Sequence, residues 1–270
     1  MSRQFERSIA IQIKTSPIGL LIYLGMVFYA LSAAGVFLPA LRMRRLFWKA
    51  GCIASAAAWL FHWFRAFGFP LQTMFEIFLT LGMLLGPLSW FCRRWLGMTD
   101  PLSELAEGLL GFCILFPAGF VFPEYPRPLP PALQSPFFIP HVGTYMFAYI
   151  LLAHAAVQAA GGLFAAPVQR EYRAFRLVRL AFPFLTMGLI LGSIWAKIAW
   201  GDWWSWDPKE LWSLACWLIY LAYFHWRADF GVRYVNANLW MLLVGFLAVL
   251  CTLLLVNLST FFKGLHNYAG

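Results

Sequence analysis

The most distinctive stretch of the sequence is the tryptophan segment, residues 200–210, which reads WGDWWSWDPKE. The tryptophans in and around it are Trp195, Trp200, Trp203, Trp204, Trp206 and Trp212. Two or three tryptophans would be typical of the aromatic belt that anchors a membrane protein at the headgroup level. Six within residues 195–212 exceed what anchoring requires. Indoles offer flat apolar faces, while their N–H groups find polar partners. The segment therefore indicates a platform for a large flat ligand such as a porphyrin.

Histidines are the natural iron ligands for such a ligand, because a neutral imidazole binds haem iron well. His141 and His266 each lie at the end of an apolar run. A lone histidine there is more often a polar anchor, but two histidines beside a tryptophan platform favour haem ligation. His225 lies inside an apolar run, where an ionisable residue is a functional candidate. The alternative for His225 is a hydrogen bond between helices, and for His62 and His154 that alternative is favoured.

Acidic residues in and near the tryptophan segment allow two interpretations. Asp207 can cap a helix that begins with Pro208, and Glu210 at the third helical position can complete a capping box. These residues therefore have a structural explanation, whereas Asp202 has none and is expected at the ligand. Glu76 is a candidate buried charge that needs a partner, and Arg65 is the nearest cation in sequence.

The composition is that of a membrane protein. Hydrophobic residues make up 62% and charged residues 11% of the chain, whereas soluble domains carry about 25% charged residues. The net charge of +9 is expected in cytoplasmic loops rather than at a nucleic-acid site. None of the five cysteines forms a C-x-x-C or C-x-x-C-H motif. This excludes a thiol–disulfide carrier and a c-type cytochrome.

We predict an all-α, polytopic membrane helix bundle that forms a single membrane domain over residues 1–270. A spanning helix needs about 20 mostly apolar residues. Eight segments qualify, near residues 17–38, 47–66, 72–92, 102–121, 141–164, 180–199, 209–227 and 236–260. Residues 1–16 are expected to form a short amphipathic segment on the membrane surface.

The basic residues predict the orientation of these spans. One set of alternate loops holds twelve of the twenty Lys and Arg residues, and the other set holds five outside the N-terminal segment. The positive-inside rule assigns the first set to the cytoplasm. Both termini are then external, although the basic N-terminal segment argues against this. Residues 199–208 between spans six and seven, His141 and His266 all fall on the external face.

These residues resemble a known family. The run WGDWWSWDPKELW, continued by FHWR at residues 224–227, is similar to the WWD motif of the CcsA/ResC family, the haem-handling proteins of system II cytochrome c biogenesis. CcmC and CcmF proteins carry different residues after the WD pair, and CcmF proteins are much longer. The runs from His141 and Gly264 resemble the family's two external-histidine segments. Arg65, Pro70 and Glu76 resemble a further element, but Phe75 and Ile77 replace its tyrosine and serine. The resemblance extends from about residue 60 to the end.

The resemblance implies roles for individual residues. His141 and His266 would be axial ligands of an external haem b, which Trp200, Trp203, Trp204, Trp206, Asp202 and Asp207 would surround. His225 would match the family's intramembrane histidine, a ligand for haem arriving from the cytoplasmic side. In the family the opposing ligand belongs to a CcsB/ResB partner, so His62 is not assigned to it.

The resulting hypothesis is a conduit that carries haem across the membrane and presents it to apocytochrome c bearing C-x-x-C-H. The chain would be a subunit of a holocytochrome c synthase (haem lyase) complex and would depend indirectly on a thiol-reducing pathway. We expect a multi-pass protein of the bacterial inner membrane with its site on the periplasmic face, and a thylakoid location is also compatible.

Two rival functions follow from other protein classes. A CcmC-like haem exporter or chaperone would pass haem to a separate ligase, but the eight spans and the Pro208–Glu210 variant of the motif argue against it. A b-type quinone oxidoreductase subunit needs histidine pairs deep in the bilayer, whereas the best-placed pair here is external.

Overall fold

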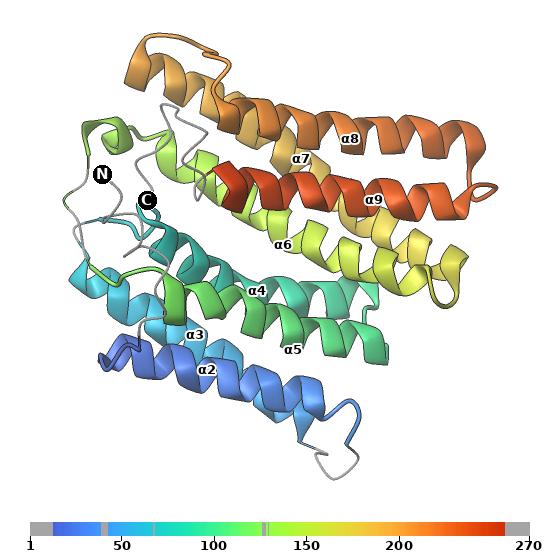
Figure 1. Ribbon diagram of the computed structural model, residues 1–270, viewed down its shortest axis with the longest axis horizontal. Helices are drawn as coiled ribbons and strands as arrows, with labels where there is room; N and C mark the ends of the chain where they lie inside the picture. Colours follow the sequence, from blue (N-terminus) through green and yellow to red (C-terminus); the bar gives the residue numbers. More distant parts are fainter. Residues whose placement is uncertain (1–12, 39–42, 67, 126–127, 129, 257–270) are drawn as a thin grey trace. The chain divides into compact units, whose positions relative to one another are not determined.

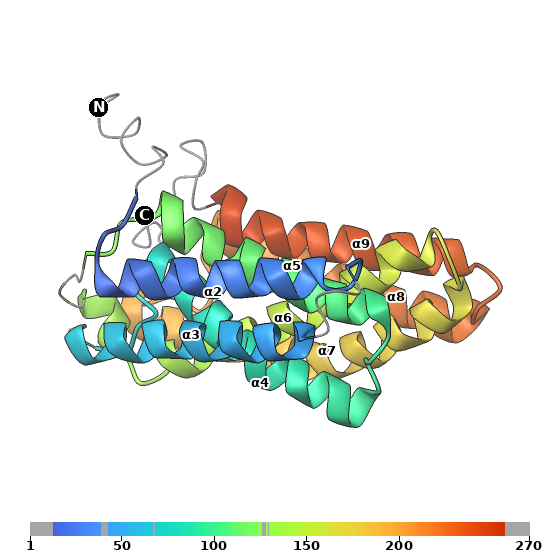
Figure 2. The same ribbon diagram turned by 90° about the horizontal axis from the view of Figure 1, so that it is seen from below.

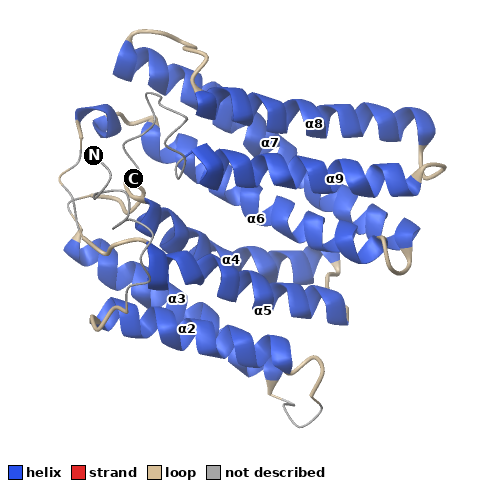
Figure 3. Ribbon diagram, in the orientation of Figure 1, coloured by secondary structure: helices blue, strands red, loops and turns tan. Residues whose placement is uncertain are grey.

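The computed structural model describes residues 13–38, 43–66, 68–125, 128 and 130–256. Within these residues every regular element is helical, as predicted (Figure 3). The α-helices are α2 (Pro17–Ala34), α3 (Arg44–Arg65), α4 (Met74–Leu96), α5 (Pro101–Phe116), α6 (Phe138–Gly162), α7 (Pro167–Trp200), α8 (Pro208–Phe230) and α9 (Val235–Leu250). Short π-helices, η1 (Pro117–Val121) and η3 (Cys251–Leu255), extend α5 and α9, and η2 (Pro131–Gln134) is a 3-10 turn.

Each of the eight predicted spans coincides with one of these helices. Six of the helices are long and apolar enough to cross a membrane: α2, α4, α5 with η1, α6, α7, and α9 with η3. This makes the chain a multi-pass membrane protein. The other two, α3 and α8, have 22 and 23 residues, enough for about 30 Å of hydrocarbon. Their aromatic, histidine and basic residues make them less hydropathic than the six.

The predicted start of the sixth span, near residue 180, is wrong as a helix boundary. The helix α7 begins at Pro167 and runs for 34 residues, about 51 Å at 1.5 Å per residue. Its first turns carry Arg170, Arg173, Arg176 and Arg179, which were expected in a loop. Arginine is a good helix former, and a proline at the first position suits a helix start. The arginines mark where the helix leaves the apolar region rather than where it starts.

The described residues divide into two compact units, residues 1–129 and residues 130–270, and each is described by itself. In the first unit, α2 packs against α3 and α5, and α4 packs against the same two helices (Figure 1). The buried ring of Tyr29 lies between Gly51 of α3 and Gly111 of α5. A Cβ atom at Gly111 would come within 2.6 Å of that ring, so only glycine allows this approach.

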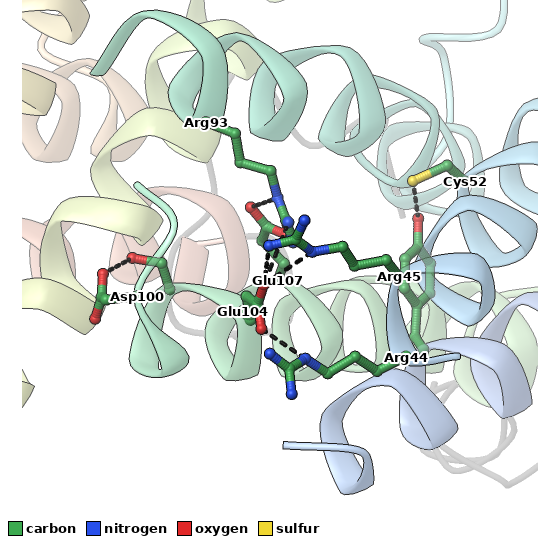
Figure 4. A network of polar contacts seen from close by, with 9 residues as sticks. Arg44, Arg45, Cys52, Arg93, Asp100, Glu104 and Glu107 are labelled. Atoms are coloured by element: carbon green, nitrogen blue, oxygen red, sulfur yellow. Dashed lines mark hydrogen bonds and ion pairs between the residues drawn. The ribbon is translucent and has the colours of Figure 1, made fainter. Parts of the chain in front are cut away.

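A buried ion-pair cluster ties one end of the first unit together (Figure 4). Glu104 of α5 is 4% exposed and pairs with Arg44 Nε at 2.7 Å and Arg45 Nη2 at 3.1 Å. Arg93 of α4 binds Glu107 of α5 through its Nε atom at 2.8–2.9 Å. The cluster therefore joins the start of α3, the end of α4 and the start of α5.

The other end of the first unit contains residues 13–16, the described part of the predicted amphipathic segment. Residues 13–15 have no helical structure, and Ser16 caps α2 by accepting a hydrogen bond from the Gly19 N–H. The Lys14 ammonium donates to the Gly119 carbonyl in η1 at 3.1 Å. Burial lowers the pKa of the Lys14 amine, and the nearby Glu124 carboxylate opposes that shift. Residues 1–12 lie outside the described residues.

In the second unit, α6 packs along α7 and α9, and α8 packs against α7 and α9. Successive helices run in opposite directions, so the start of α6, the end of α7, the start of α8 and the end of η3 lie at one end of the unit in both Figure 1 and Figure 2. The tryptophan segment connects α7 to α8 at this end. The fold thus brings His141, in the first turn of α6, to the same end as the tryptophans.

Candidate functional site

The His141 ring is held in a fixed seat against α7. Its Nδ1 atom lies 2.8 Å from the Gly188 carbonyl oxygen. A carbonyl can only accept, so Nδ1 carries the proton, and in the neutral imidazole Nε2 then carries the lone pair, which is the tautomer that binds a metal. The ring also lies directly on Gly192, where a Cβ atom would approach the His141 Cε1 atom to 2.5 Å. Neither the role of Gly188 nor that of Gly192 is apparent from the sequence alone.

Aromatic rings complete the seat. The Trp195 indole stacks on the His141 ring, with centroids 5.6 Å apart and planes 27° apart. Tyr145, one turn further along α6, meets the ring edge-on at 5.2 Å. Trp195 is fully buried and donates from Nε1 to the Ala132 carbonyl at 2.7 Å. Trp195 therefore supports the His141 ring and has no indole face exposed for a ligand, in contrast to Trp203 and Trp206.

The tryptophan segment begins with a sharp turn at the end of α7. Trp200, the last residue of α7, packs edge-on against Trp195 at 4.7 Å. Gly201 adopts a left-handed conformation with φ of 91°, which favours glycine, and its N–H donates to the Lys197 carbonyl. The chain then folds back along α7, because Ser193 Oγ donates to the Trp203 carbonyl at 2.9 Å. Ser193 directly follows Gly192, so the segment returns beside the stretch that seats His141.

The central tryptophans differ in exposure. Trp203 and Trp206 are 57% and 66% exposed, which leaves indole faces available. Trp204 meets Trp206 at nearly right angles, with centroids 6.1 Å apart. Its Nε1 is buried and has no hydrogen-bond acceptor among the described residues. An exposed pair of indoles next to a buried, unused donor fits a flat ligand with polar substituents.

Trp206 is also held in an unfavourable backbone conformation, with φ of 57°. Left-handed backbone costs a residue with a Cβ atom roughly 1–2 kcal/mol. Strain of this kind is found where the surrounding structure fixes a side chain for function. The Trp206 side chain is therefore aimed outward at a cost in stability.

The capping predicted for Asp207 and Glu210 is confirmed. Asp207 is the N-cap of α8, Pro208 is its first residue, and Asp207 with Glu210 forms a capping box. The Glu210 carboxylate accepts from the backbone N–H groups of Ser205 at 2.8 Å and Asp207 at 3.1 Å. Both carboxylates are buried and fix the end of the segment onto α8. Asp202 is exposed and lies in the turn after Gly201.

His225 lies at the other end of the second unit. It is exposed on α8, 18 residues after Asp207, which corresponds to about 27 Å along the helix. His225 and His141 therefore lie at opposite ends of the second unit, and the binding of haem at each stays a prediction. Arg227, two residues after His225, pairs with Glu171 through its Nε atom at 2.7 Å.

The structure also describes His154 and His62, and both are buried. His154 is 6% exposed within α6. His62, in the first unit, is 1% exposed and its Nε2 lies 3.0 Å from Glu76 Oε1. His62 is therefore the partner of Glu76, whereas Arg65 is exposed near Phe61. His266 lies outside the described residues, so its expected position beside the tryptophan segment stays a prediction.

The sequence matches the family described as Cytochrome C assembly protein over residues 46–266. A protein of Synechococcus sp. (strain RCC307) named cytochrome c biogenesis protein CcsA is 30% identical, and the match covers 84% of this chain and 85% of the relative. A second CcsA, of Synechococcus sp. (strain JA-3-3Ab), is 29% identical over 90% of each chain. The CcsA of Chlamydomonas reinhardtii is 31% identical, over 77% of this chain and 63% of its own length.

The family match covers the His141 seat, the tryptophan segment and His225. The similarity to these two CcsA proteins covers 84% and 90% of this chain. The chain therefore belongs to the cytochrome c assembly protein family, and within it to the CcsA proteins of cytochrome c biogenesis.

Proposed function

We propose that this chain carries haem b across the membrane and presents it at an external site for covalent attachment to apocytochrome c, together with a CcsB/ResB-like partner. Haem is the substrate of this process rather than a resident cofactor. The observation that carries the proposal is the seat of His141. Its proton is fixed on Nδ1 and its ring is stacked on Trp195, at the end of the unit where the exposed indoles of the tryptophan segment lie.

At the external site, His141 would bind one side of the iron and His266 the other. The exposed Trp203 and Trp206 indoles would lie against the porphyrin faces or edges, and Trp204 Nε1, Asp202 and Asp207 would meet its polar groups. The hydrogen bond from Nδ1 to Gly188 raises the basicity of Nε2 and fixes the ring plane. Two imidazole ligands also limit access of oxygen to the iron, which favours a reduced haem.

The attachment itself requires mainly positioning. Each apocytochrome thiol adds across one haem vinyl group, so that the sulfur bonds to one vinyl carbon and the thiol hydrogen ends on the other. The addition consumes no external oxidant or reductant. Holding the vinyl groups and thiols in contact raises their effective concentration. On this account the chain is a subunit of a holocytochrome c synthase complex, and the C-x-x-C-H motif of the apocytochrome is its second substrate.

The charges at the two ends of the second unit support this direction of transport. Arg170, Arg173 and Arg176 at the start of α7, with Arg227 and Arg233 near the end of α8, lie at the end away from the tryptophan segment. The positive-inside rule assigns that end to the cytoplasm. Haem would then enter near His225 and leave at the periplasmic face of a bacterial inner membrane, or at the lumenal face of a thylakoid. With α3 and α8 counted as spans, eight helices cross the membrane and both termini are external.

The test is haem content and cytochrome c maturation in a strain that expresses the complex. His141→Ala and His266→Ala, alone and together, are expected to lose haem and abolish maturation. His154→Gln, in the same helix as His141, is the matched control and is expected to retain both. Unchanged haem and maturation in the double variant would refute the proposal. Co-purification with a CcsB-like subunit, rather than with a soluble haem chaperone, distinguishes it from a CcmC-like exporter.

A further inference from the structure

One buried carboxylate links three helices at the His225 end of the second unit. Glu171, in the second turn of α7, has no exposed surface. It accepts hydrogen bonds from Tyr223 Oη at 2.7 Å and Arg227 Nε at 2.7 Å, both from α8. Asn238 Nδ2, from α9, donates to the same oxygen at 3.3 Å. The sequence alone predicts no role for Glu171, because this residue lies among arginines that are typical of a loop.

These contacts compensate the cost of burying the charge. An unpaired buried carboxylate is strongly destabilising, whereas one that is paired and hydrogen-bonded on several sides is tolerated. Arg227 supplies the countercharge and a second contact, from Nη2 to Glu171 Oε2 at 3.2 Å. The Arg227 guanidinium also lies 3.7 Å from the ring centroid of Phe175, one turn further along α7. Arg227 is thus held between two residues of α7, which leaves it little freedom to turn.

The spacing of these residues determines where His225 points. An α-helix turns by about 100° per residue, so residues four apart share a face and residues two apart lie on nearly opposite faces. Tyr223 and Arg227 are four apart, and His225 is two residues from each. When Glu171 draws Tyr223 and Arg227 inward, His225 must face outward. The observed burial agrees, because Tyr223 is fully buried and His225 is exposed.

The same cluster fixes α8 along its axis. The helix ends at Gly231, whose φ of 58° suits glycine. Asn238 Nδ2 donates to the Gly231 carbonyl at 2.9 Å as well as to Glu171. The Asn238 amide of α9 is therefore bonded both to the end of α8 and to the Glu171 carboxylate, which sets the rotation of α8. Figure 1 shows α7, α8 and α9 side by side at this end.

His225 differs from His141 in how its ring is supported. The His141 ring has its own hydrogen bond to Gly188 and its own aromatic neighbours. No described residue makes a hydrogen bond or a ring contact with His225. Its direction therefore depends on the rotation of α8 alone.

We propose that Glu171 is a positioning residue for His225: by binding Tyr223 and Arg227 it sets the rotation of α8 that presents the His225 imidazole on the outer face of the helix. The inference rests on the proposed function, in which His225 binds haem arriving from the cytoplasmic side. Glu171 does not touch the haem. Arg227, engaged by Glu171 and Phe175, serves the same purpose and is not the partner of a haem propionate.

The experiment compares variants of the whole chain, co-expressed and purified with its partner, in a His141→Ala background that removes external ligation. Glu171→Gln keeps the shape of the side chain and removes its charge. Tyr223→Phe and Arg227→Lys remove single contacts with smaller effects on folding. The readouts are haem per folded protein, the low-spin ferric signal in electron paramagnetic resonance, and the midpoint potential of the remaining haem. Glu104→Gln, a buried arginine-paired glutamate of the first unit, is the matched control.

Glu171→Gln is expected to lose most of the His225-dependent low-spin signal and to shift the midpoint potential of the haem that remains bound. Glu104→Gln is expected to lower stability without changing the low-spin signal or the midpoint potential. Tyr223→Phe and Arg227→Lys should show the same change in smaller degree, and they decide the matter if Glu171→Gln does not fold. Wild-type signal and potential in the folded Glu171 and Arg227 variants would overturn the positioning role and leave the proposed function intact. If His225→Ala itself leaves the signal unchanged, ligation by His225 and the positioning role both fail.

Discussion

A methyl group at Gly192 is predicted to displace the His141 imidazole. In Gly192→Ala the new carbon would lie 2.5 Å from Cε1 and 2.7 Å from Nδ1 of His141, whereas unstrained contacts need about 3.5 Å. The ring must therefore move by about 1 Å. Trp195 and Tyr145 flank it, so the movement lengthens the 2.8 Å hydrogen bond to Gly188 beyond the usual range.

The expected effect combines two terms. Forcing an extra methyl group into a packed site costs about 1–3 kcal/mol, and losing the hydrogen bond costs about 0.5–1.5 kcal/mol. Removing the partner that orients a ligating histidine typically weakens metal binding about 10–100-fold. We therefore expect Gly192→Ala to fold and to bind haem at the external site at least about tenfold more weakly.

The assay is haem titration and retention in the purified complex, with the absorption spectrum recorded before and after gel filtration. Gly143→Ala is the matched control, because it also lies in a helix near His141 but, among the described residues outside its own helix backbone, no atom comes within 4 Å of its new methyl group. Alanine is favoured over glycine in a helix by up to about 1 kcal/mol, so the control should retain haem and gain slightly in stability. Wild-type haem affinity in Gly192→Ala would refute the reasoning about the His141 seat.

Three further predictions concern the segment and the first unit. Replacing Asp207 by Ala removes the cap of α8 and should lower the unfolding free energy by about 1 kcal/mol, measured by thermal unfolding; an unchanged Tm would contradict the capping role. Trp206→Gly relieves the positive φ, so stability should rise by about 1 kcal/mol while haem retention falls, and retained haem would show that this indole is dispensable. Glu104→Gln leaves Arg44 and Arg45 without their buried partner and should lower the unfolding free energy by about 3–5 kcal/mol. The amount of haem per folded protein should stay constant, and a loss of haem would contradict the prediction that this cluster affects stability alone.

The sequence predicted the helices well because each apolar run is long enough to require one. It also predicted the Asp207–Glu210 capping box, since that motif depends only on local spacing. The predicted start of the sixth span is wrong as a helix boundary because arginines, although typical of loops outside the membrane, are compatible with helical backbone. That error hid Glu171, whose partners Tyr223 and Asn238 come from two later helices.

Contacts between helices that are separated in the sequence account for the other differences between the predicted and the observed contacts. Gly188 and Gly192 lie in an ordinary apolar run, and their role appears only when α6 packs along α7. His62 and Glu76 are 14 residues apart, and the turn between α3 and α4 brings them together. Charge and sequence distance favoured Arg65 for Glu76, but the helix presents His62 inward and Arg65 outward. Periodicity predicts that a residue is buried, but it does not identify what the residue contacts.

Ligation of the haem iron by His141 can be tested by replacing the ligand nitrogen of histidine with the sulfur of methionine. Near-infrared magnetic circular dichroism of the oxidised complex distinguishes bis-histidine from histidine–methionine coordination. A bis-histidine band is expected in the wild-type complex and a histidine–methionine band in His141→Met. A bis-histidine band from the external haem that persists unchanged in His141→Met would contradict ligation of the iron by His141.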